Sequence, residues 1–453
     1  MAVSDVLVIG AGLAGVEASL TLANAGRRVY LVERRAYFGG NVIKSEEVFP
    51  NMECATCMLA PKQSDVIENP NIELLTLAEV KDIKGEPGAF DVTLLRRARY
   101  VSLENCIGCA ACFEPCPVAA PNEFEEGLSQ RKAISFACAG ALPNAPAINM
   151  AECLRSKGQE CTACRDACMF DAINYEDKDE ERTVKVGAVV VATGYRLSDA
   201  GLPERSGNVY GAFEFERLRA SNGPTEGEIR TRDGNPPKSI ALIHCAGRKE
   251  KGYCSQVCCR YLAKFARYAF DKLDGVEVHE FVQEASVPGK TSQQFFDTAV
   301  KKGVKLVRTA TTPLVSASGP KVKVEFQANG NKESVEVDMA VLAPAIEPDP
   351  GAVALAELLG IETDSFGFFR TVEAEPAATT RAGVFIAGCN CGPKDMQTVV
   401  VQAQAAAAGV LQMNHRDTEA EEKTTETRSQ EESNRGEAEA KSGEDGLTGE
   451  QDG

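Results

Sequence analysis

The first 33 residues carry the pattern that most restricts the fold. An apolar run at 5–9 leads into Gly10-x-Gly12-x-x-Gly15, a helical pattern follows, and a second apolar run ends at Glu33. Glycines in this register allow a tight turn, close approach of the backbone to a pyrophosphate and close helix–strand packing, and an acid after the second strand can accept ribose hydroxyls. The unit therefore predicts a dinucleotide-binding α/β domain, with the pyrophosphate at a helix N-terminus.

Two later segments indicate that the dinucleotide is FAD. Residues 188–196 form an apolar strand that ends in Ala-Thr-Gly, and residues 379–410 read as a strand, a loop and a helix of small residues. Both resemble the flavin-contacting segments of flavoproteins with two dinucleotide-binding domains, although Cys389 stands where those proteins usually carry an acid. We expect FAD contacts from Gly10, Gly12, Gly15, Glu33, Arg34, Gly40, Thr193, Gly194, Gly388, Cys389, Lys394 and Asp395.

Seventeen cysteines, without a visible secretory signal, point to metal ligands or redox thiols rather than to a disulfide framework. The run CIGCAACFEPCP has the spacing of bacterial ferredoxins, in which the fourth cysteine ligates the other cluster. A second, less regular group ends at Cys168, where Met169 replaces the usual proline. We expect two [4Fe–4S] clusters, one held by Cys106, Cys109, Cys112 and Cys168, and the other by Cys116, Cys153, Cys161 and Cys164.

A second nucleotide-binding unit is expected at 201–345, but it lacks the glycine motif. Its first strand and helix flank the loop CAGRKEKGYC, which offers thiols and cations where a pyrophosphate needs unobstructed backbone amides. We infer that nicotinamide binding has been lost. The thiols of Cys245, Cys254, Cys258 and Cys259 favour a third [4Fe–4S] cluster, and buried or exchanging cysteines are the alternative.

Three further cysteines carry weaker signals. Cys54 and Cys57 have the spacing of a redox pair or of half a metal site. Structural thiols, cluster or metal ligation, and a reactive disulfide all remain open for them. Cys138 lies outside every group and is expected to be a buried thiol.

The predicted fold is therefore α/β, a two-dinucleotide-binding-domain flavoprotein. It combines a Rossmann-like FAD domain, a degenerate second Rossmann-like domain and an inserted bacterial 2[4Fe–4S] ferredoxin domain. The expected boundaries are 1–97, 182–200 and 346–413 for the FAD domain, 98–181 for the ferredoxin-like insertion, 201–345 for the four-cysteine module, and 414–453 for a disordered acidic tail.

Composition excludes several other functions. A net charge of −17 argues against nucleic-acid binding. The longest apolar run, 187–192, is far too short to span a membrane, so we expect a cytoplasmic protein whose membrane contact comes only through partners. His244, His279 and His415 are too scattered to form a catalytic site, and no Ser/His/Asp or paired-carboxylate motif appears.

Taken together, the glycine motif, CIGCAACFEPCP, HCAGRKEKGYCSQVCC and AGCNCGPKDM resemble the A subunit of heterodisulfide reductase over residues 1–413. The resemblance implies FAD and several [4Fe–4S] clusters, one of them held near the flavin by the four-cysteine segment. It also implies that Lys264 lies near the flavin ring. We expect Lys264 or Lys394 to hydrogen-bond the flavin and tune its potential. Methanogen-type members continue into a further ferredoxin domain, whereas this shorter chain is similar to the A subunit of the quinone-interacting membrane-bound oxidoreductase of sulfate reducers.

That second similarity implies a specific electron route. The protein would relay electrons between the menaquinone pool and adenylylsulfate reductase in dissimilatory sulfate reduction, docked on the cytoplasmic face of the membrane. Its partners would be a homologous flavin and iron–sulfur subunit, together with a haem-bearing membrane subunit. The alternatives are a heterodisulfide-reductase-like electron-bifurcating subunit, an NAD(P)H-dependent flavoprotein that feeds the ferredoxin domain, and a scaffold whose flavin is structural.

Overall fold

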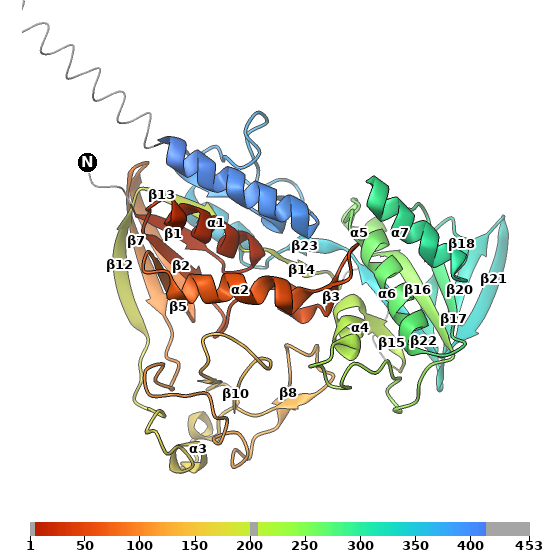
Figure 1. Cartoon of the computed structure of the whole chain (residues 1–453), viewed down its shortest axis with the longest axis horizontal. Helices are drawn as coiled ribbons and strands as arrows, with labels where there is room; N and C mark the ends of the chain where they lie inside the picture. The colour runs from red at the N-terminus through yellow and green to blue at the C-terminus, as the bar shows by residue number, and fades with distance from the viewer. Residues whose placement is uncertain (1–4, 200–206, 414–453) are drawn as a thin grey trace, which may run out of the picture.

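The computed structural model describes residues 5–199 and 207–413 (Figure 1), so the expected acidic tail lies outside the described residues. At the centre of the FAD domain is a five-stranded parallel sheet with the order β24-β13-β1-β2-β5. Its strands come from three separate parts of the chain: β1 Val6–Ile9, β2 Val29–Glu33, β5 Ile72–Thr76, β13 Ala188–Val191 and β24 Val384–Ile386. The short runs β1, β2, β13 and β24 are wholly buried, as strands covered on both faces must be, whereas the edge strand β5 is partly exposed.

Alternate side chains of this sheet enter two different cores. One face packs against α1 (Leu13–Asn24) and the helix at 396–413, which lie side by side in Figure 1, red beside blue. The other face packs against α8 (Ala352–Leu359) and a three-stranded antiparallel sheet. The strands of that sheet are β6 Ala78–Glu86, β7 Ala89–Arg96 and β12 Glu180–Val186.

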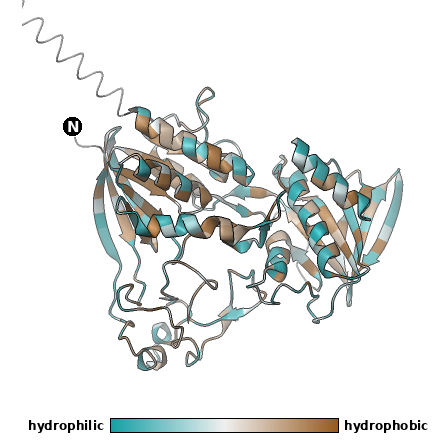
Figure 2. Cartoon of the chain, in the orientation of Figure 1, coloured by the Kyte–Doolittle hydropathy of each residue, from teal (hydrophilic) through white to brown (hydrophobic). Residues whose placement is uncertain are grey.

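A second parallel sheet, with the order β15-β22-β16-β17-β18, organises residues 207–344. The helices on one face are α4 Ala212–Arg219, α6 Cys258–Lys272 and α7 Lys290–Lys301, and an antiparallel sheet covers the other. Figure 2 shows that apolar residues gather on the inner strands, while β21 and β12 at the outer edges are largely hydrophilic. The strands are β15 Val209–Gly211, β16 Ser239–Ala246, β17 Glu277–Val282, β18 Lys305–Arg308, β19 Leu314–Ser318, β20 Lys321–Ala328, β21 Asn331–Val337 and β22 Met339–Pro344.

Two strands connect the FAD domain with the second parallel-sheet domain. The chain leaves the FAD domain through β14 (Tyr195–Leu197) and returns through β23 (Ile346–Pro348), and the two pair antiparallel. Among the described residues, no helix is both long enough and apolar enough to cross a membrane. Parallel sheets joined in this way give an α/β fold with two dinucleotide-type domains, as the sequence predicts.

The segment between β7 and β12 has little regular structure. It forms a separate small core in which cysteine side chains pack with aliphatic ones. Its sequence has no sustained period of two or 3.6, which accounts for the short elements. They are β8 Ala120–Pro121, β9 Gln130–Arg131, β10 Ile134–Ser135, β11 Ala147–Ile148, η2 Leu154–Lys157 and α3 Ala163–Asp166.

A buried arginine of the second parallel-sheet domain contacts both the cysteine-rich segment and the FAD domain. Arg217, on α4, is 0% exposed and contacts Glu125 of the cysteine-rich segment through Nε, at 2.8 Å from Oε2. Its Nη1 donates to the Lys44 carbonyl of the FAD domain at 3.2 Å, and its Nη2 donates to Asn222. One guanidinium therefore holds together surfaces that are far apart in sequence.

The remaining elements, apart from α2, are short. A hairpin of β3 (Glu47–Val48) and β4 (Glu53–Cys54) precedes α2 (Ala55–Glu68) and packs toward α6 through a hydrogen bond from Glu47 N to the Tyr268 hydroxyl. The others are η1 Val42–Lys44, α5 Arg248–Lys251 and η3 Cys389–Cys391.

Candidate functional site: a flavin pocket and three cysteine groups

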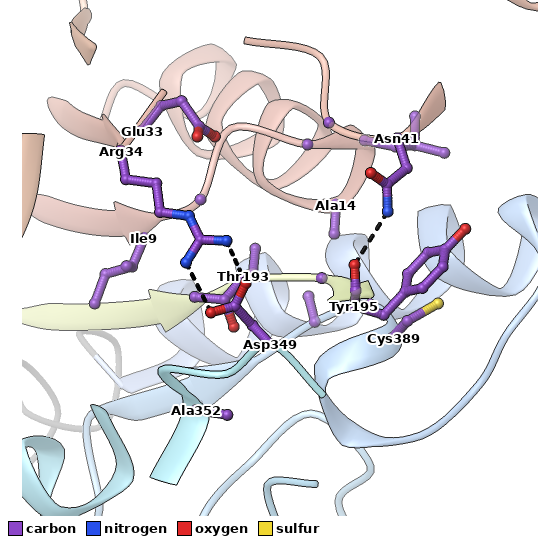
Figure 3. Close-up of a pocket in the computed structure, with 18 of the residues that line it drawn as sticks. Ile9, Ala14, Glu33, Arg34, Asn41, Thr193, Tyr195, Asp349, Ala352 and Cys389 are labelled. Carbon is purple, nitrogen blue, oxygen red and sulfur yellow. Dashed lines mark hydrogen bonds and ion pairs between the residues drawn. The ribbon is translucent and has the colours of Figure 1, made fainter. Parts of the chain in front are cut away.

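A cavity of about 440 Å³ lies at the carboxyl ends of β1, β2 and β13 (Figure 3), where ligands of parallel α/β sheets bind. The three parts of the chain that form the central sheet all contribute to its lining. Ten of the residues expected to contact FAD line it: Gly10, Gly12, Glu33, Arg34, Gly40, Thr193, Gly194, Gly388, Cys389 and Lys394.

Gly15 and Asp395, also expected there, do not line the cavity. A Cβ on Gly15 would lie 1.8 Å from the Gly10 carbonyl oxygen, so this glycine serves the packing of α1 against the turn. Asp395 instead precedes the helix at 396–413, and its Oδ1 accepts a hydrogen bond from Thr398 N at 2.8 Å. Both residues shape the cavity from outside it.

The phosphate turn is open where a ligand would approach. A Cβ on Gly12 would meet only Gly40 Cα, at 3.6 Å, so the space beside it is free. The helix α1 starts after Gly12 without a side-chain cap, which leaves its first backbone N–H groups available to an anion. This turn suits a pyrophosphate.

Glu33 is held at the rim by the backbone. Its Oε2 accepts from Ala11 N and its Oε1 from Arg35 N, each at 3.0 Å. A carboxylate has about four acceptor positions, so both oxygens can still accept ribose hydroxyls. Nearby, the Thr193 hydroxyl is buried and has no partner among the described residues, although Thr193 lines the cavity. An unsatisfied hydroxyl at this place is a further feature that fits FAD.

Asp349, Asn41 and Tyr195 line the cavity but were not predicted from the sequence, and two of them contact predicted residues. Arg34 and Asp349 form an ion pair across the cavity wall, with Nη1 at 2.8 Å from Oδ1 (Figure 3). Asn41 Nδ2 donates to the Tyr195 carbonyl at 3.1 Å, and the Cys389 side chain lies beside the Tyr195 ring. The only sequence signal for Asp349 was its place in EPDP, directly after β23.

The thiol at the site of the usual acid is unsuited to act as an anion. Cys389 is 6% exposed, and burial raises its pKa to about 11. The neutral thiol therefore cannot replace the charge of a carboxylate, although its size and place fit a flavin contact.

In the cysteine-rich segment, the structure brings the thiols together in the predicted sets. One small cavity is lined by Cys106, Cys109, Cys112 and Cys168, and another by Cys116, Cys153, Cys161 and Cys164. The remaining walls are mainly apolar, with Val101 and Ile173 at the first cavity and Val118 and Ile148 at the second.

Thiols so grouped suit an iron–sulfur cluster chemically, because thiolates are its usual ligands. Burial, followed by the neighbouring thiols Cys164, Cys106 and Cys168, raises the pKa of Cys112 to about 12, and bound iron would offset this cost. In residues 5–199 and 207–413, however, no three His, Cys, Asp or Glu side chains stand in an arrangement that holds a metal ion. Cluster ligation by these cysteines therefore remains a prediction.

The four-cysteine segment converges at the junction of β16 and α6. Cys245 is the second-last residue of β16, with a positive φ of 58°, while Cys258 and Cys259 are the first two residues of α6. Burial and then the nearby Cys259, Cys245 and Cys254 thiols raise the pKa of Cys258. Backbone N–H groups point at two of them: Gln256 N lies 3.4 Å from the Cys254 sulfur, and Ser286 N lies 3.4 Å from the Cys259 sulfur.

The two lysines differ in their surroundings. Lys394 lines the flavin cavity, and its Nζ lies 3.3 Å from the Cys391 sulfur. Lys264, expected near the flavin ring, does not line the cavity. Its Nζ is buried between Glu216, at 2.8 Å from Oε2, and the Glu47 carbonyl, also at 2.8 Å, because a buried carboxylate needs a counter-charge.

Cys54 and Cys57 form a disulfide in the structure, with their Cα atoms 5.2 Å apart at the start of α2. Both residues are exposed. In this state neither sulfur is a thiolate that could bind a metal. Cys138 is half-buried beside Leu59 and Phe124, and burial raises its pKa to about 11.

Comparison with known proteins agrees with this architecture. The profile of the FAD-dependent oxidoreductase family matches residues 5–54. Thioredoxin reductase of Lactococcus lactis superposes with a TM-score of 0.51 and 12% identity, over 90% of this chain and 98% of that one. Bacillithiol disulfide reductase of Bacillus cereus gives a TM-score of 0.50 and 12% identity, over the same shares. The fold and the pocket thus define a two-domain FAD-dependent oxidoreductase.

Sequence relatives narrow the class to a family. The chain is 38% identical over 420 residues to the iron–sulfur A subunit of the CoB–CoM heterodisulfide reductase of Methanocaldococcus jannaschii, covering 89% of this chain and 63% of the relative. It is 33% identical over 460 residues to the heterodisulfide reductase A-subunit-like protein of Archaeoglobus profundus, covering 90% and 66%. The chain belongs to the family of heterodisulfide reductase A subunits, and it spans less than two thirds of the length of these relatives.

Proposed function

We propose that this chain is the flavin and iron–sulfur electron-transfer subunit of a heterodisulfide-reductase-like complex. FAD, when bound, exchanges electrons in pairs, and [4Fe–4S] clusters exchange them singly. The observation that carries the proposal is the presence, in one chain, of a flavin cavity, of two cavities lined by four cysteines each, and of four further cysteines in and beside the loop between β16 and α6.

The residues around these sites support a relay rather than covalent substrate chemistry. The flavin cavity is lined mainly by small and aliphatic side chains, and its charged lining residues are Glu33, Arg34, Arg35, Glu79, Asp349 and Lys394. An ion pair between Arg260 of α6 and Asp395 joins the helix that carries Cys258 and Cys259 to the loop at the flavin cavity. The protein thereby binds, orients and shields the cofactors.

The proposal for the wider electron route has two parts: the kind of complex, and the particular partners and electron carriers. Relatives named as CoB–CoM heterodisulfide reductases support assembly with other subunits of such a reductase. They favour the heterodisulfide-reductase-like reading over the sulfate-reduction route. The homologous flavin subunit, the haem-bearing membrane subunit, adenylylsulfate reductase and the menaquinone pool stay predictions from the resemblance, as does electron bifurcation.

Cofactor content tests the proposal directly. Anaerobically purified protein should contain about twelve irons per FAD, as three cubanes of four irons each, with matching acid-labile sulfide. Replacing Cys112, Cys164 or Cys258 by serine should remove about four irons each, while Cys138→Ser, outside the three groups, should leave the content unchanged. About eight irons in the wild type would remove the third cluster, and an iron-free flavoprotein would overturn the proposal.

A nicotinamide test separates this function from the NAD(P)H-dependent alternative. Cys254 lies in the β16–α6 loop and three further cysteines flank it, where a pyrophosphate would need bare backbone amides. Adding NADH or NADPH under anaerobic conditions should therefore leave the flavin absorbance oxidised, whereas dithionite should bleach it. Rapid bleaching by either nucleotide would favour a self-contained reductase instead.

A further inference from the structure

The disulfide between Cys54 and Cys57 is not used by the flavin cavity or by either cysteine-lined cavity. Neither residue lines any of these three cavities, and the two are separated by 3 in sequence. A disulfide stabilises a fold mainly by restricting the unfolded chain, and the effect grows with the length of the loop that it closes. Because this loop is so short, the bond restricts the chain little, and a purely structural role accounts for it poorly.

The bond is open to other molecules. Cys54 and Cys57 are both exposed, and so is Thr56 between them. Met58, directly after Cys57, is 48% exposed. Methionine side chains are flexible and polarisable, and they are common on surfaces that bind varied partners. A thiol or disulfide of another molecule can therefore reach these sulfurs without any part of the fold opening.

Hydrogen bonds, rather than the S–S bond, hold the backbone around the pair. The hairpin of β3 and β4 leads directly into α2 (Figure 1), with Glu47 opposite Cys54 in the strand pairing. Ala55 N donates to the Glu46 carbonyl at 2.9 Å, and Leu59, one turn into the helix, is buried. The same backbone can thus carry either a disulfide or two thiols, as a reversible site requires.

Cys54 is placed to be the nucleophile of the pair. It is the N-cap residue of α2, and its sulfur accepts a hydrogen bond from Cys57 N at 3.1 Å. The first turn of α2 contains no acid, and Glu53, directly before Cys54, is exposed, so solvent and salt screen its charge. A backbone N–H and the positive end of a helix both stabilise a thiolate, which is the form that attacks a disulfide.

We propose that Cys54 and Cys57 form a thiol–disulfide exchange site, with Cys54 as the attacking thiol and Cys57 as the resolving thiol, for a partner that carries a disulfide. In the reduced state, the Cys54 thiolate attacks one sulfur of the partner disulfide, and the other partner sulfur leaves as a thiolate. Cys57 then loses its proton and attacks the Cys54 sulfur, which closes the bond seen here and releases the second partner sulfur.

The exchange needs no other oxidant or reductant. The partner disulfide gains two electrons and the pair loses two, while the two thiol protons pass through solvent to the released partner thiolates. A partner dithiol reduces the pair again by the reverse steps. The inference goes beyond the proposed function, because it requires neither the flavin nor a cluster.

Mass spectrometry of alkylated, full-length protein tests the site. Anaerobic protein is equilibrated with mixtures of reduced and oxidised glutathione, free thiols are blocked, and the peptide that contains both cysteines is weighed. The pair should change from a disulfide to two blocked thiols in one two-electron step. In Cys57→Ser, a mixed disulfide with glutathione should accumulate on Cys54. In Cys54→Ser it should form on Cys57 about tenfold more slowly, because that thiolate is not the helix cap.

Cys138 provides the matched control within the same samples. This half-buried thiol has a pKa raised to about 11 by burial, so it should form no mixed disulfide, and Cys138→Ser should behave as the wild type. A second arm compares oxidised glutathione with oxidised thioredoxin at equal concentration. Faster oxidation of the pair by thioredoxin identifies a protein partner, and faster oxidation by glutathione identifies a small thiol.

Three results would overturn the inference. A pair that stays a disulfide in the folded protein, even in excess dithiothreitol, would be structural. Loss of iron from Cys54→Ser or Cys57→Ser would make the two residues metal ligands. Equal rates in the two serine variants would remove the assignment of Cys54 as nucleophile. The wild-type titration decides the first point without any variant, and the iron content of the wild type, which tests the proposed function, does not enter.

Discussion

At the scale of single residues, the glycines of the phosphate turn perform different tasks. Gly15 has no room for a Cβ, since the Gly10 carbonyl oxygen would lie 1.8 Å away, whereas Gly12 has free space where a ligand would enter. The same sequence motif thus contains one glycine needed for packing and one needed for ligand approach.

Substitution by alanine should separate these tasks. Gly12→Ala should leave the melting temperature of the apoprotein unchanged but lower FAD affinity at least about tenfold, because the new methyl meets the pyrophosphate. Gly15→Ala should destabilise the apoprotein itself. Thermal unfolding of apoprotein and flavin fluorescence titration measure the two effects, and equal stability losses in both variants would contradict the division.

Lys264 should act mainly on stability. Lys264 and Glu216 have side chains 6% and 3% exposed, so Lys264→Met strands a buried carboxylate and should cost about 3–5 kcal/mol of unfolding free energy. The double variant Lys264→Met/Glu216→Gln should recover much of this loss. The free energy of unfolding in urea measures both the loss and the recovery. A changed flavin potential with unchanged stability would instead support the flavin-tuning role that the family resemblance implies.

What could be predicted at this scale depends on how local the signal is. Gly10, Gly12 and Glu33 belong to one continuous motif and could be identified without the fold. Asp349 and Glu216 find their partners hundreds or tens of residues away, Arg34 and Lys264 respectively, and only tertiary packing reveals such pairs.

At the scale of elements, the helix at 396–413 depends on its N-terminal cap. Asp395 accepts from Thr398 N and pairs with Arg260 of α6. Burial alone would raise the pKa of Asp395, but the hydrogen bonds from Thr398 and the Arg260 contact outweigh it and lower the pKa. The stabilisation is therefore complete above about pH 4, the usual value of an unfolded aspartate, and is lost as the pH falls through the lowered folded value.

Two variants of Asp395 should separate capping from charge. Asp395→Ala removes both and should cost about 1 kcal/mol or more, while Asp395→Asn keeps a good capping oxygen and should cost less. Only the aspartate protein should show the acid-dependent part of the loss. Unfolding between pH 3 and 7, with flavin retention as a second readout, measures this. Equal behaviour of the two variants would argue against a capping role.

Strands and long helices were predictable because their apolar periodicity is strong, as in β1, β13 and α6. The short elements of the cysteine-rich segment were not, because the sequence there has no sustained period and its core is built around thiols. Cysteine spacing nevertheless predicted which thiols share a cavity. The disulfide of Cys54 and Cys57 could not be chosen over the alternatives, since spacing alone allows all of them.

At the scale of the whole molecule, Arg217 should control whether the FAD domain, the cysteine-rich segment and the second parallel-sheet domain unfold together. Arg217→Gln leaves Glu125 buried without its partner and should cost about 3–5 kcal/mol. It should also split one cooperative unfolding transition into two. Arg219→Gln, on the same helix but with ion pairs of 3.8 Å, is the control and should cost less than about 1 kcal/mol.

Calorimetry and limited proteolysis at the domain junctions measure the effect. A single transition in Arg217→Gln, with protease sensitivity equal to that of the wild type, would show that the junction does not depend on this residue.

The buried Arg217 has a consequence for speed as well as for stability. Electron tunnelling falls exponentially with the gap between donor and acceptor, so a swinging domain would make each transfer wait for a rare close approach. Arg217 of α4 contacts Glu125 of the cysteine-rich segment, the Lys44 carbonyl and Asn222 at the same time, and these contacts resist such swinging. We therefore expect the distances between the proposed cofactor sites to stay constant. The rate of electron transfer should then depend on partner docking rather than on internal motion.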